Sequence, residues 1–262
     1  PSVARYCGSE LHKYIVRAEA FEKGNCKAAL KSGFLTLDQV IREDPNYHGD
    51  TSGCTAITAT ITKDNVLYVG NAGDSRAVLC SDGSAFALSS DHKPVNIGES
   101  RRIVVAGGFV ESGRVNGSLA LSRAFGDYEF KTNAVLGPED QIVTGIWDCM
   151  SSQEVATFVR KGIADKFSLD KICEMTMDHC LSPDSDVNYI GCDNMTIVIV
   201  AILNGKTVEE WYDHIAAKVA TRLGPADPSI KRLNGDEDPE TIAAEEIGVA
   251  PTESRGGPLD IQ

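Results

Sequence analysis

Several hallmarks of common protein classes are missing from this chain of 262 residues. The sequence holds no apolar run near the roughly 20 residues that cross a bilayer, and its longest, Met195 to Leu203, has the length of a buried strand. Its eight cysteines form no CxxC pair, which argues against a zinc site and against a disulfide framework. Basic residues are too few to balance the acids, and the net charge of -13 argues against nucleic acid or membrane as a partner.

What is present is the composition of an ordinary soluble globular protein, with 42% hydrophobic and 24% charged residues. No signal peptide is visible, although the chain opens on Pro1 and not on methionine. Scattered cysteines of this kind are typical of reduced thiols, so we expect a cytoplasmic or nuclear protein.

The first part of the chain predicts two helices followed by strands. Apolar spacing indicates helices over residues 3–15 and 26–42, and the second should end at Asp44-Pro45. Residues 54–88 are rich in β-branched and small apolar residues and contain two turn sequences, 63–65 and 81–83. The connections are too short for parallel crossovers, so we expect an antiparallel meander. Glycines interrupt residues 92–135, where we expect no long element.

The second part predicts three more helices and a buried strand. A capping box at Ser151 begins a helix that runs to Ile163, and further helices are expected over residues 169–180 and 208–223. Residues 195–203 read as the strand. The composition then changes, because residues 225–262 hold nine acids and three bases and no aromatic residue. We therefore expect one domain over residues 1–223 and a disordered acidic tail over 224–262.

Three aspartates lie where predicted elements begin or end. Asp74 follows a strand, Asp148 precedes a helix, and Asp193 precedes the strand at 195–203. Carboxylate oxygens suit hard cations such as Mg²⁺ or Mn²⁺. Taken singly, each is more often a turn or capping aspartate.

Basic side chains near such a site could hold a phosphate oxygen, although a surface salt bridge is the simpler interpretation of each. His92 could act as a general acid or base, or it could be structural. No serine has a neighbouring histidine in a nucleophile pattern, and the phosphate-binding loop GxxxxGK[ST] is missing. The basic candidates are Arg76, Lys93, Arg102, Arg114 and Arg123.

A series of short strings resembles the successive motifs of the type 2C serine/threonine protein phosphatases. In chain order they are GCTA at 53–56, NAGDSRAV at 71–78, SDHKP at 90–94, AGG at 106–108, RVNG at 114–117, LALSRA at 119–124, GIWD at 145–148 and GCDNMT at 191–196. Each string is weak evidence alone, but the order over residues 2–222 is specific.

The resemblance implies an α+β fold of four layers, in which two central antiparallel sheets are flanked by antiparallel helices. It also implies phosphoprotein substrates and a binuclear Mg²⁺ or Mn²⁺ site, in some members with a third ion. The metals would activate a water for in-line attack on phosphoserine or phosphothreonine.

Carried over position by position, the resemblance makes Asp193 a ligand of the catalytic metal pair. It makes Asp74 and Asp148 ligands of the third metal, and it places Arg114 in the flap that borders the substrate groove. No residue of this sequence matches the general-acid histidine.

The departures from the family pattern are as informative as the matches. Members carry Asp-Gly-His-Gly-Gly just before the segment that matches residues 1–5, and they carry two further strands between Thr144 and Gly145, ending in Ala-Cys-Asp. With one carboxylate of the catalytic cluster left, the chain as written is expected to hold the two catalytic cations poorly, because each prefers about six oxygens.

Three functions therefore remain open. The first is an active metal-dependent phosphatase, expected to be a monomer. The second is an inactive relative that binds phosphoproteins as a scaffold, and the third is a metal-independent interaction domain.

Overall fold

The computed structural model describes residues 2–137, 140–141, 151–180 and 195–221. The chain divides into two compact units, residues 1–225 and 226–262, and all described residues belong to the first. The predicted bounds of the domain, residues 1–223, and of the acidic tail, residues 224–262, stay predictions.

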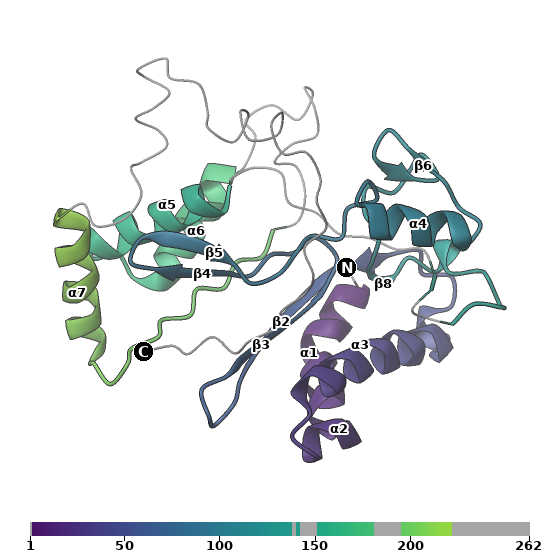
Figure 1. The fold of residues 1–262 in the computed structure, drawn as a ribbon, viewed down its shortest axis with the longest axis horizontal. Helices are drawn as coiled ribbons and strands as arrows, with labels where there is room; N and C mark the ends of the chain where they lie inside the picture. The colour runs from purple at the N-terminus through teal and green to yellow at the C-terminus, as the bar shows by residue number, and fades with distance from the viewer. Residues whose placement is uncertain (1, 138–139, 142–150, 181–194, 222–262) are drawn as a thin grey trace, which may run out of the picture. The chain divides into compact units, whose positions relative to one another are not determined.

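The amino-terminal half contains helices α1 Ser2–Arg17, α2 Glu19–Glu22 and α3 Cys26–Glu43, and then strands β1 Gly53–Cys54, β2 Ala56–Ile61, β3 Leu67–Ala72, β4 Val78–Ser81 and β5 Ser84–Ala87. After these come α4 Ile97–Val105, β6 Val110–Glu111, β7 Arg114–Val115, β8 Phe125–Gly126, α5 Ser152–Ala164, α6 Leu169–Cys180 and α7 Val208–Ala220. Short 3-10 helices cover Pro45–Tyr47 and Tyr128–Phe130. This mixture confirms the α+β prediction (Figure 1).

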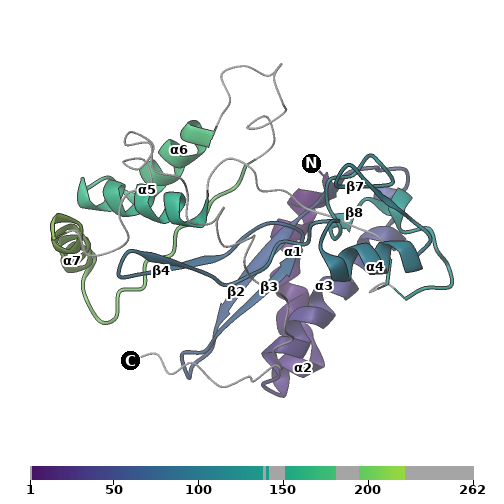
Figure 2. The ribbon, with the colours of Figure 1, turned by 45° about the horizontal axis from the view of Figure 1, so that its top comes forward.

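The largest core cluster forms between α1 and α3, which lie side by side (Figures 1 and 2). Buried residues at every fourth position of α1 meet the apolar stripe of α3. The helices approach so closely at Gly33 that an added Cβ would lie 2.6 Å from Ile15 Cγ1. Phe125 of β8 closes the cluster. Its buried members are Val3, Cys7, Leu11, Ile15, Leu30, Leu37, Ile41 and Phe125.

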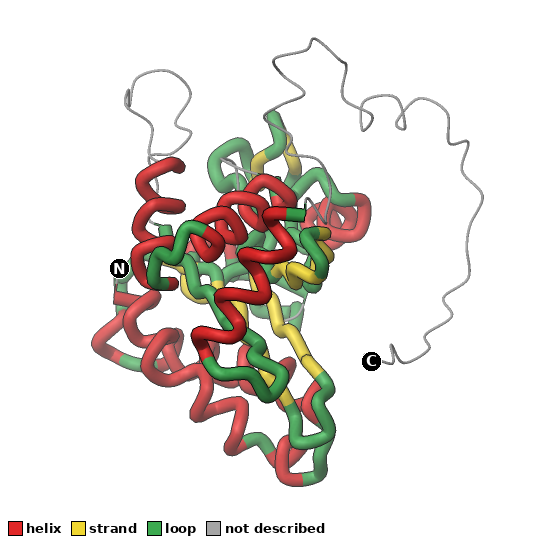
Figure 3. The backbone as a smooth tube through the Cα atoms, turned by 90° about the vertical axis from the view of Figure 1, so that its left-hand side faces the viewer, coloured by secondary structure: helices red, strands yellow, loops and turns green. Residues whose placement is uncertain are grey.

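The strands form two-stranded antiparallel pairs, and Figure 3 shows how short they are beside the helices and loops. β2 pairs with β3 from Ala56↔Ala72 to Ile61↔Leu67, and β4 pairs with β5. Both predicted turns are confirmed. In the second turn, Asp82 (φ 49°) and Gly83 (φ 89°) have the positive φ values of a type I′ hairpin turn. The meander prediction is wrong at one joint, because β3 and β4 are not paired with each other. Residues 73–77 form bends and coil between these strands.

Helices α5 and α7 begin as their sequences require. Ser151 and Thr207 each form a complete capping box, with Glu154 and Glu210 as the reciprocal partners. Helix α5 contacts α6, α7 and the β4–β5 hairpin. Gln153 of α5 fastens the hairpin, because its side chain accepts from Ala85 N–H at 3.0 Å and donates to the Gly83 carbonyl at 2.8 Å.

Two further expectations are corrected. Residues 97–105 form helix α4 where glycines had suggested no long element; the glycines at 107 and 108 follow the helix and end it. Residues 195–203 form no strand in the structure. Their burial alternates as in a strand, but within the described residues no neighbouring segment forms a ladder with them. A strand is defined by its pairing partner as much as by its side-chain pattern.

No helix of the described ranges is long and apolar enough to cross a membrane.

Candidate functional site

Asp74 lies in the loop that leaves β3, and its side chain is fully buried. The Nζ atom of Lys93 approaches Asp74 Oδ2 at 2.5 Å. The next residue, Ser75, shares a hydrogen bond of 2.7 Å between its hydroxyl and that of Thr55. The sequence prediction of a carboxylate at a strand end is therefore confirmed, and the structure adds a lysine at the carboxylate.

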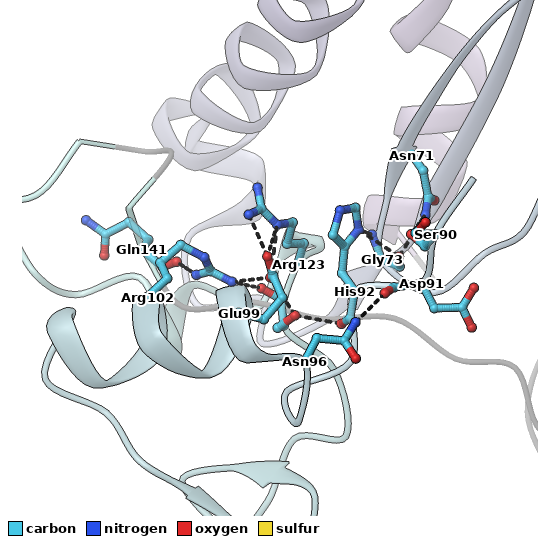
Figure 4. A network of polar contacts seen from close by, with 11 residues as sticks. Asn71, Gly73, Ser90, Asp91, His92, Asn96, Glu99, Arg102, Arg123 and Gln141 are labelled. Atoms are coloured by element: carbon cyan, nitrogen blue, oxygen red, sulfur yellow. Dashed lines mark hydrogen bonds and ion pairs between the residues drawn. The ribbon is translucent and has the colours of Figure 1, made fainter. Parts of the chain in front are cut away.

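Two side chains, those of Asn71 and His92, hold the loop before Asp74 through contacts with backbone groups (Figure 4). The His92 Nδ1 atom lies 3.2 Å from the Gly73 nitrogen and 2.9 Å from the Gly73 oxygen, so either tautomer finds a partner. Asn71 donates to the carbonyl oxygens of Gly73 and Ser90. Burial lowers the pKa of His92, and nearby Arg123 lowers it further. A neutral imidazole bonded to backbone supports the structural interpretation of His92.

Arg76, two residues beyond Asp74, forms a bidentate ion pair with Asp91. Its Nε lies 3.1 Å from Oδ1 and its Nη2 lies 2.6 Å from Oδ2. Its Nη1 also donates to the Ser152 hydroxyl at 3.3 Å, which joins this loop to the first turn of α5. The guanidinium fork thus fixes the orientation of the segment that carries Asp74.

A second polar cluster surrounds Glu99 of α4. Arg102 Nη2 and Arg123 Nη2 lie 2.6 and 2.7 Å from its two oxygens. The Ser122 hydroxyl lies 2.6 Å from Glu99 and 2.6 Å from the His92 carbonyl oxygen. Burial of Glu99 acts to raise its pKa, but the hydrogen bonds from Arg123, Ser122 and Arg102 outweigh it and lower the pKa to about 2. Glu99 is therefore ionised at neutral pH, and both of its carboxylate oxygens accept hydrogen bonds.

Arg114 lies in β7 of the β6–β7 hairpin and is exposed. Its Nη1 donates to the Ser118 carbonyl at 2.7 Å. No contact between Arg114 and the Asp74 loop is found among the described residues, so a role in substrate contact stays a prediction.

A cavity of about 710 Å³ opens between α3, β3 and the segment 122–131. Asn71 and Ala72, just before the Asp74 loop, line it, as do several basic side chains. Three of these basic side chains form ion pairs: Arg102 and Arg123 with Glu99, and Lys131 with Asp38 at 2.7 Å.

One of the three predicted metal ligands lies among the described residues, and two do not. Asp74 is described, whereas Asp148 and Asp193 lie outside the described residues. Within the described ranges no group of three or more His, Cys, Asp or Glu side chains could hold a metal. Because Mg²⁺ and Mn²⁺ prefer about six oxygens, and because the Lys93 ammonium lies at Asp74, the described residues do not by themselves fit a divalent cation.

The simpler interpretation of four basic candidates, a salt bridge, is confirmed, but three of the four pairs are half-buried or more. The side chains of Arg76, Lys93 and Arg102 are 24%, 29% and 12% exposed, whereas that of Arg123 is 42% exposed. Sequence reasoning missed their acidic partners, Asp91 and Glu99. The spacing of Glu99 and Arg102, three apart on one helix face, was an available signal.

Two solved structures are similar in fold to this chain. A phosphatase of Toxoplasma gondii matches with a TM-score of 0.50 at 24% identity, over 67% of this chain and 75% of that one. A sex-determining protein of Caenorhabditis elegans matches with a TM-score of 0.53 at 21% identity, over 67% of this chain and 50% of that one. Both structures therefore share the α+β fold of this chain.

The chain belongs to the protein phosphatase 2C family, whose model matches residues 2–189. "Protein phosphatase 2C homolog 2" of Aspergillus fumigatus is 51% identical over 248 residues, which cover 86% of this chain and 58% of that protein. The protein of the same name from Schizosaccharomyces pombe is 49% identical over 264 residues, covering 92% of this chain and 70% of that one. The chain thus spans little more than half the length of the Aspergillus relative. The resemblance found in the sequence is confirmed.

Proposed function

We propose that this chain is the catalytic region of a protein serine/threonine phosphatase that depends on Mg²⁺ or Mn²⁺. The observation that carries the proposal is the family match over residues 2–189, together with fungal relatives near 50% identity that bear the name of protein phosphatase 2C. The substrates would be phosphoproteins that carry phosphoserine or phosphothreonine.

The described residues support this function by the way in which they hold Asp74. The carboxylate is buried at a strand end, and three neighbouring interactions fix its loop: His92 on Gly73, Arg76 on Asp91, and Ser75 on Thr55. Such support is what a ligand or substrate-orienting carboxylate requires. The cavity that begins beside this loop offers space for a phosphorylated side chain.

The metal ligands are part of the proposal. Asp193 would serve the catalytic cations, and Asp74 and Asp148 would serve a third ion. Metal ions supply electrostatic stabilisation and an activated water to phosphate hydrolysis. We further propose that the protein is a monomer and that it works in the cytoplasm or the nucleus.

The test is hydrolysis of a phosphothreonine peptide by the purified protein, whose intact mass is first compared with 28.1 kDa for these 262 residues. We expect phosphate release with Mn²⁺ or Mg²⁺ and none after chelation. Asp193→Ala should abolish the release, whereas Asp64→Asn, in the exposed β2–β3 turn, should leave it unchanged. Binding of the phosphopeptide without turnover, in a protein of intact sequence, would favour the inactive scaffold instead.

A further inference from the structure

Among the described residues, two Asn-Gly pairs lie in the same kind of turn. Asn116 (φ 50°) and Gly117 (φ 73°) follow β7, and Asn204 (φ 50°) and Gly205 (φ 79°) precede α7. These are the positive φ values of a type I′ turn, which favours this dipeptide. In each turn the N–H of the residue after the glycine donates to the carbonyl oxygen of the residue before the asparagine, at 3.0 Å. The two sites share dipeptide and turn type, so a difference in their chemistry must come from their surroundings; a third pair, at 234–235, lies outside the described residues.

The first turn is anchored to the residue that precedes β6. Asn116 Oδ1 accepts a hydrogen bond of 3.0 Å from the Phe109 N–H, and the Asn116 N–H donates to the Phe109 carbonyl oxygen at 2.8 Å. A Cβ added at Gly117 would lie 3.2 Å from Glu111 Oε2, so a carboxylate lies close to this glycine. The carboxamide of Asn116 is thus fixed in one orientation, and the charge beside it disfavours a second anion.

The second turn has no such anchor. Asn204 and Gly205 are both exposed, and no hydrogen bond from a described residue holds the Asn204 side chain. A Cβ added at Gly205 would meet nothing within 4 Å. The next residue is Lys206, whose positive charge favours an anionic main-chain nitrogen nearby. The Asn204 carboxamide is therefore free to rotate until its carbon faces the Gly205 nitrogen.

We propose that Asn204 is a site of spontaneous deamidation in the folded protein, and that the anchor protects Asn116 from the same reaction. The Gly205 main-chain nitrogen loses its proton and attacks Cγ of Asn204, which glycine permits because it has no Cβ to obstruct the approach. A new C–N bond closes a cyclic imide, the bond from Cγ to the amide nitrogen breaks, and that nitrogen leaves as ammonia with the proton. Water then adds to one carbonyl carbon of the imide, and the ring C–N bond breaks. Addition at Cγ gives aspartate, and addition at the main-chain carbon gives isoaspartate.

The isoaspartyl product would change the main chain where it leads into α7. It inserts a methylene group into the turn, so the hydrogen bond from Lys206 to Leu203 can no longer close in the same geometry. Helix α7, with Thr207 as its cap, follows at once and packs on α5. The aspartyl product keeps the main chain, and aspartate is tolerated at positive φ. We therefore expect the urea midpoint to fall in the isoaspartyl form and to stay nearly unchanged in the variant Asn204→Asp.

Peptide mapping after incubation of the folded protein at mildly alkaline pH tests the proposal. Trypsin places the Asn-Gly pairs in separate peptides, residues 115–123, 172–206 and 233–255. Deamidation replaces NH by O in the mass of a peptide, fragmentation locates the change, and a sample digested without incubation corrects for deamidation during digestion. Asn204 should deamidate at least several times faster than Asn116 in the folded protein. In urea, where the anchor of Asn116 is lost, the ratio of the two rates should fall. The variant Asn204→Ser should lose the change at this position and keep the slow rate at Asn116.

Equal rates at the two asparagines of the folded protein would overturn the proposal, and so would an unchanged Asn204. A rate ratio that is the same in urea as in the folded protein would refute the role of the anchor at Asn116. An isoaspartyl form with the same urea midpoint as the variant Asn204→Asp would refute the effect on α7. Mapping of the unsubstituted protein decides the first two points even if a variant does not fold. Because the readout is mass and not phosphate release, the outcome is independent of the proposed enzymatic function.

Discussion

Replacing Lys93 by methionine would remove the ammonium from the buried carboxylate of Asp74 while keeping a side chain of similar length. The Asp74 side chain is 0% exposed and that of Lys93 is 29% exposed, with 2.5 Å between Nζ and Oδ2. The pair is therefore closer to a buried ion pair than to a surface one, and its loss should lower the free energy of unfolding of the whole unit.

The magnitude follows from the distance and the burial. At 2.5 Å and an effective dielectric constant of about 20, the Coulomb attraction is about 7 kcal/mol. Desolvation of both groups offsets part of it, and removing one partner of a buried pair costs about 3–5 kcal/mol. Since Lys93 retains some solvent contact, we expect a loss near 3 kcal/mol, or a melting temperature lower by about 6–12 °C.

Thermal unfolding followed by circular dichroism, in the presence of a chelator, measures the loss. The control is Lys171→Met, which removes an exposed ion pair with Glu174 on α6 and should leave the melting temperature nearly unchanged. The double variant Asp74→Asn/Lys93→Met should be more stable than Lys93→Met alone, because the neutral amide that replaces the carboxylate does not need the ammonium of Lys93. If Lys93→Met and Lys171→Met have the same melting temperature, the Lys93 ammonium does not stabilise the buried Asp74 carboxylate in solution, and the predicted loss is refuted.

Three further predictions concern the fold around the site. Glu99→Gln should destabilise the protein by about 3 kcal/mol at pH 7, because the Glu99 pKa is lowered from 4.5 to about 2. This contribution to stability is present above pH 4.5 and is lost as the pH falls toward 2. Between these pH values the urea midpoint of the variant should therefore vary less than that of the unsubstituted protein. Gly33→Ala should lower the urea midpoint strongly because its Cβ would lie 2.9 Å from the Ile15 backbone, whereas Gly8→Ala, which meets nothing within 4 Å, should raise stability by about 0.5–1 kcal/mol. Ser151→Ala should cost about 1 kcal/mol in the same titration through loss of the α5 cap.

Local signals in the sequence were sufficient for most helices. The apolar spacing of residues 3–15 and 26–42 found α1 and α3 to within two residues at each end, and the Ser151 capping box placed the start of α5. These features depend on neighbours in the sequence, which periodicity and capping rules describe well. The sequence pattern does not predict helix α4, because the glycines that follow the helix indicate an interrupted segment.

Features that depend on distant partners could not be predicted in the same way. Residues 195–203 have the composition of a strand, yet strand formation requires a ladder, and a ladder depends on chain elsewhere. The pairing of β1 with β8 joins residues more than 70 positions apart and left no mark in the composition of either segment.

The same distinction between local signals and distant partners applies to the candidate site. The positions of Asp74, Arg76 and Lys93 were identified from motifs, but their partners were not, since Asp91 lies 15 residues from Arg76, and Lys93 lies 19 from Asp74. Of the cluster at Glu99, the sequence indicates Arg102 and Arg123 as candidates but not the glutamate that joins them, because the cluster is assembled from α4 and from residues 23 and 24 positions later.

The attachment of the β4–β5 hairpin to α5 has a consequence for the order of folding. The hairpin can close within microseconds of its synthesis, but the Gln153 side chain that fastens it lies 68 to 70 residues further along the chain. At a ribosomal rate of about 5–20 residues per second, that helix follows only after about 4–14 seconds. During this interval the face of the hairpin that α5 will cover is open to whatever else is near the nascent chain, so the vulnerable period of this protein is set by translation and not by the speed at which its strands pair.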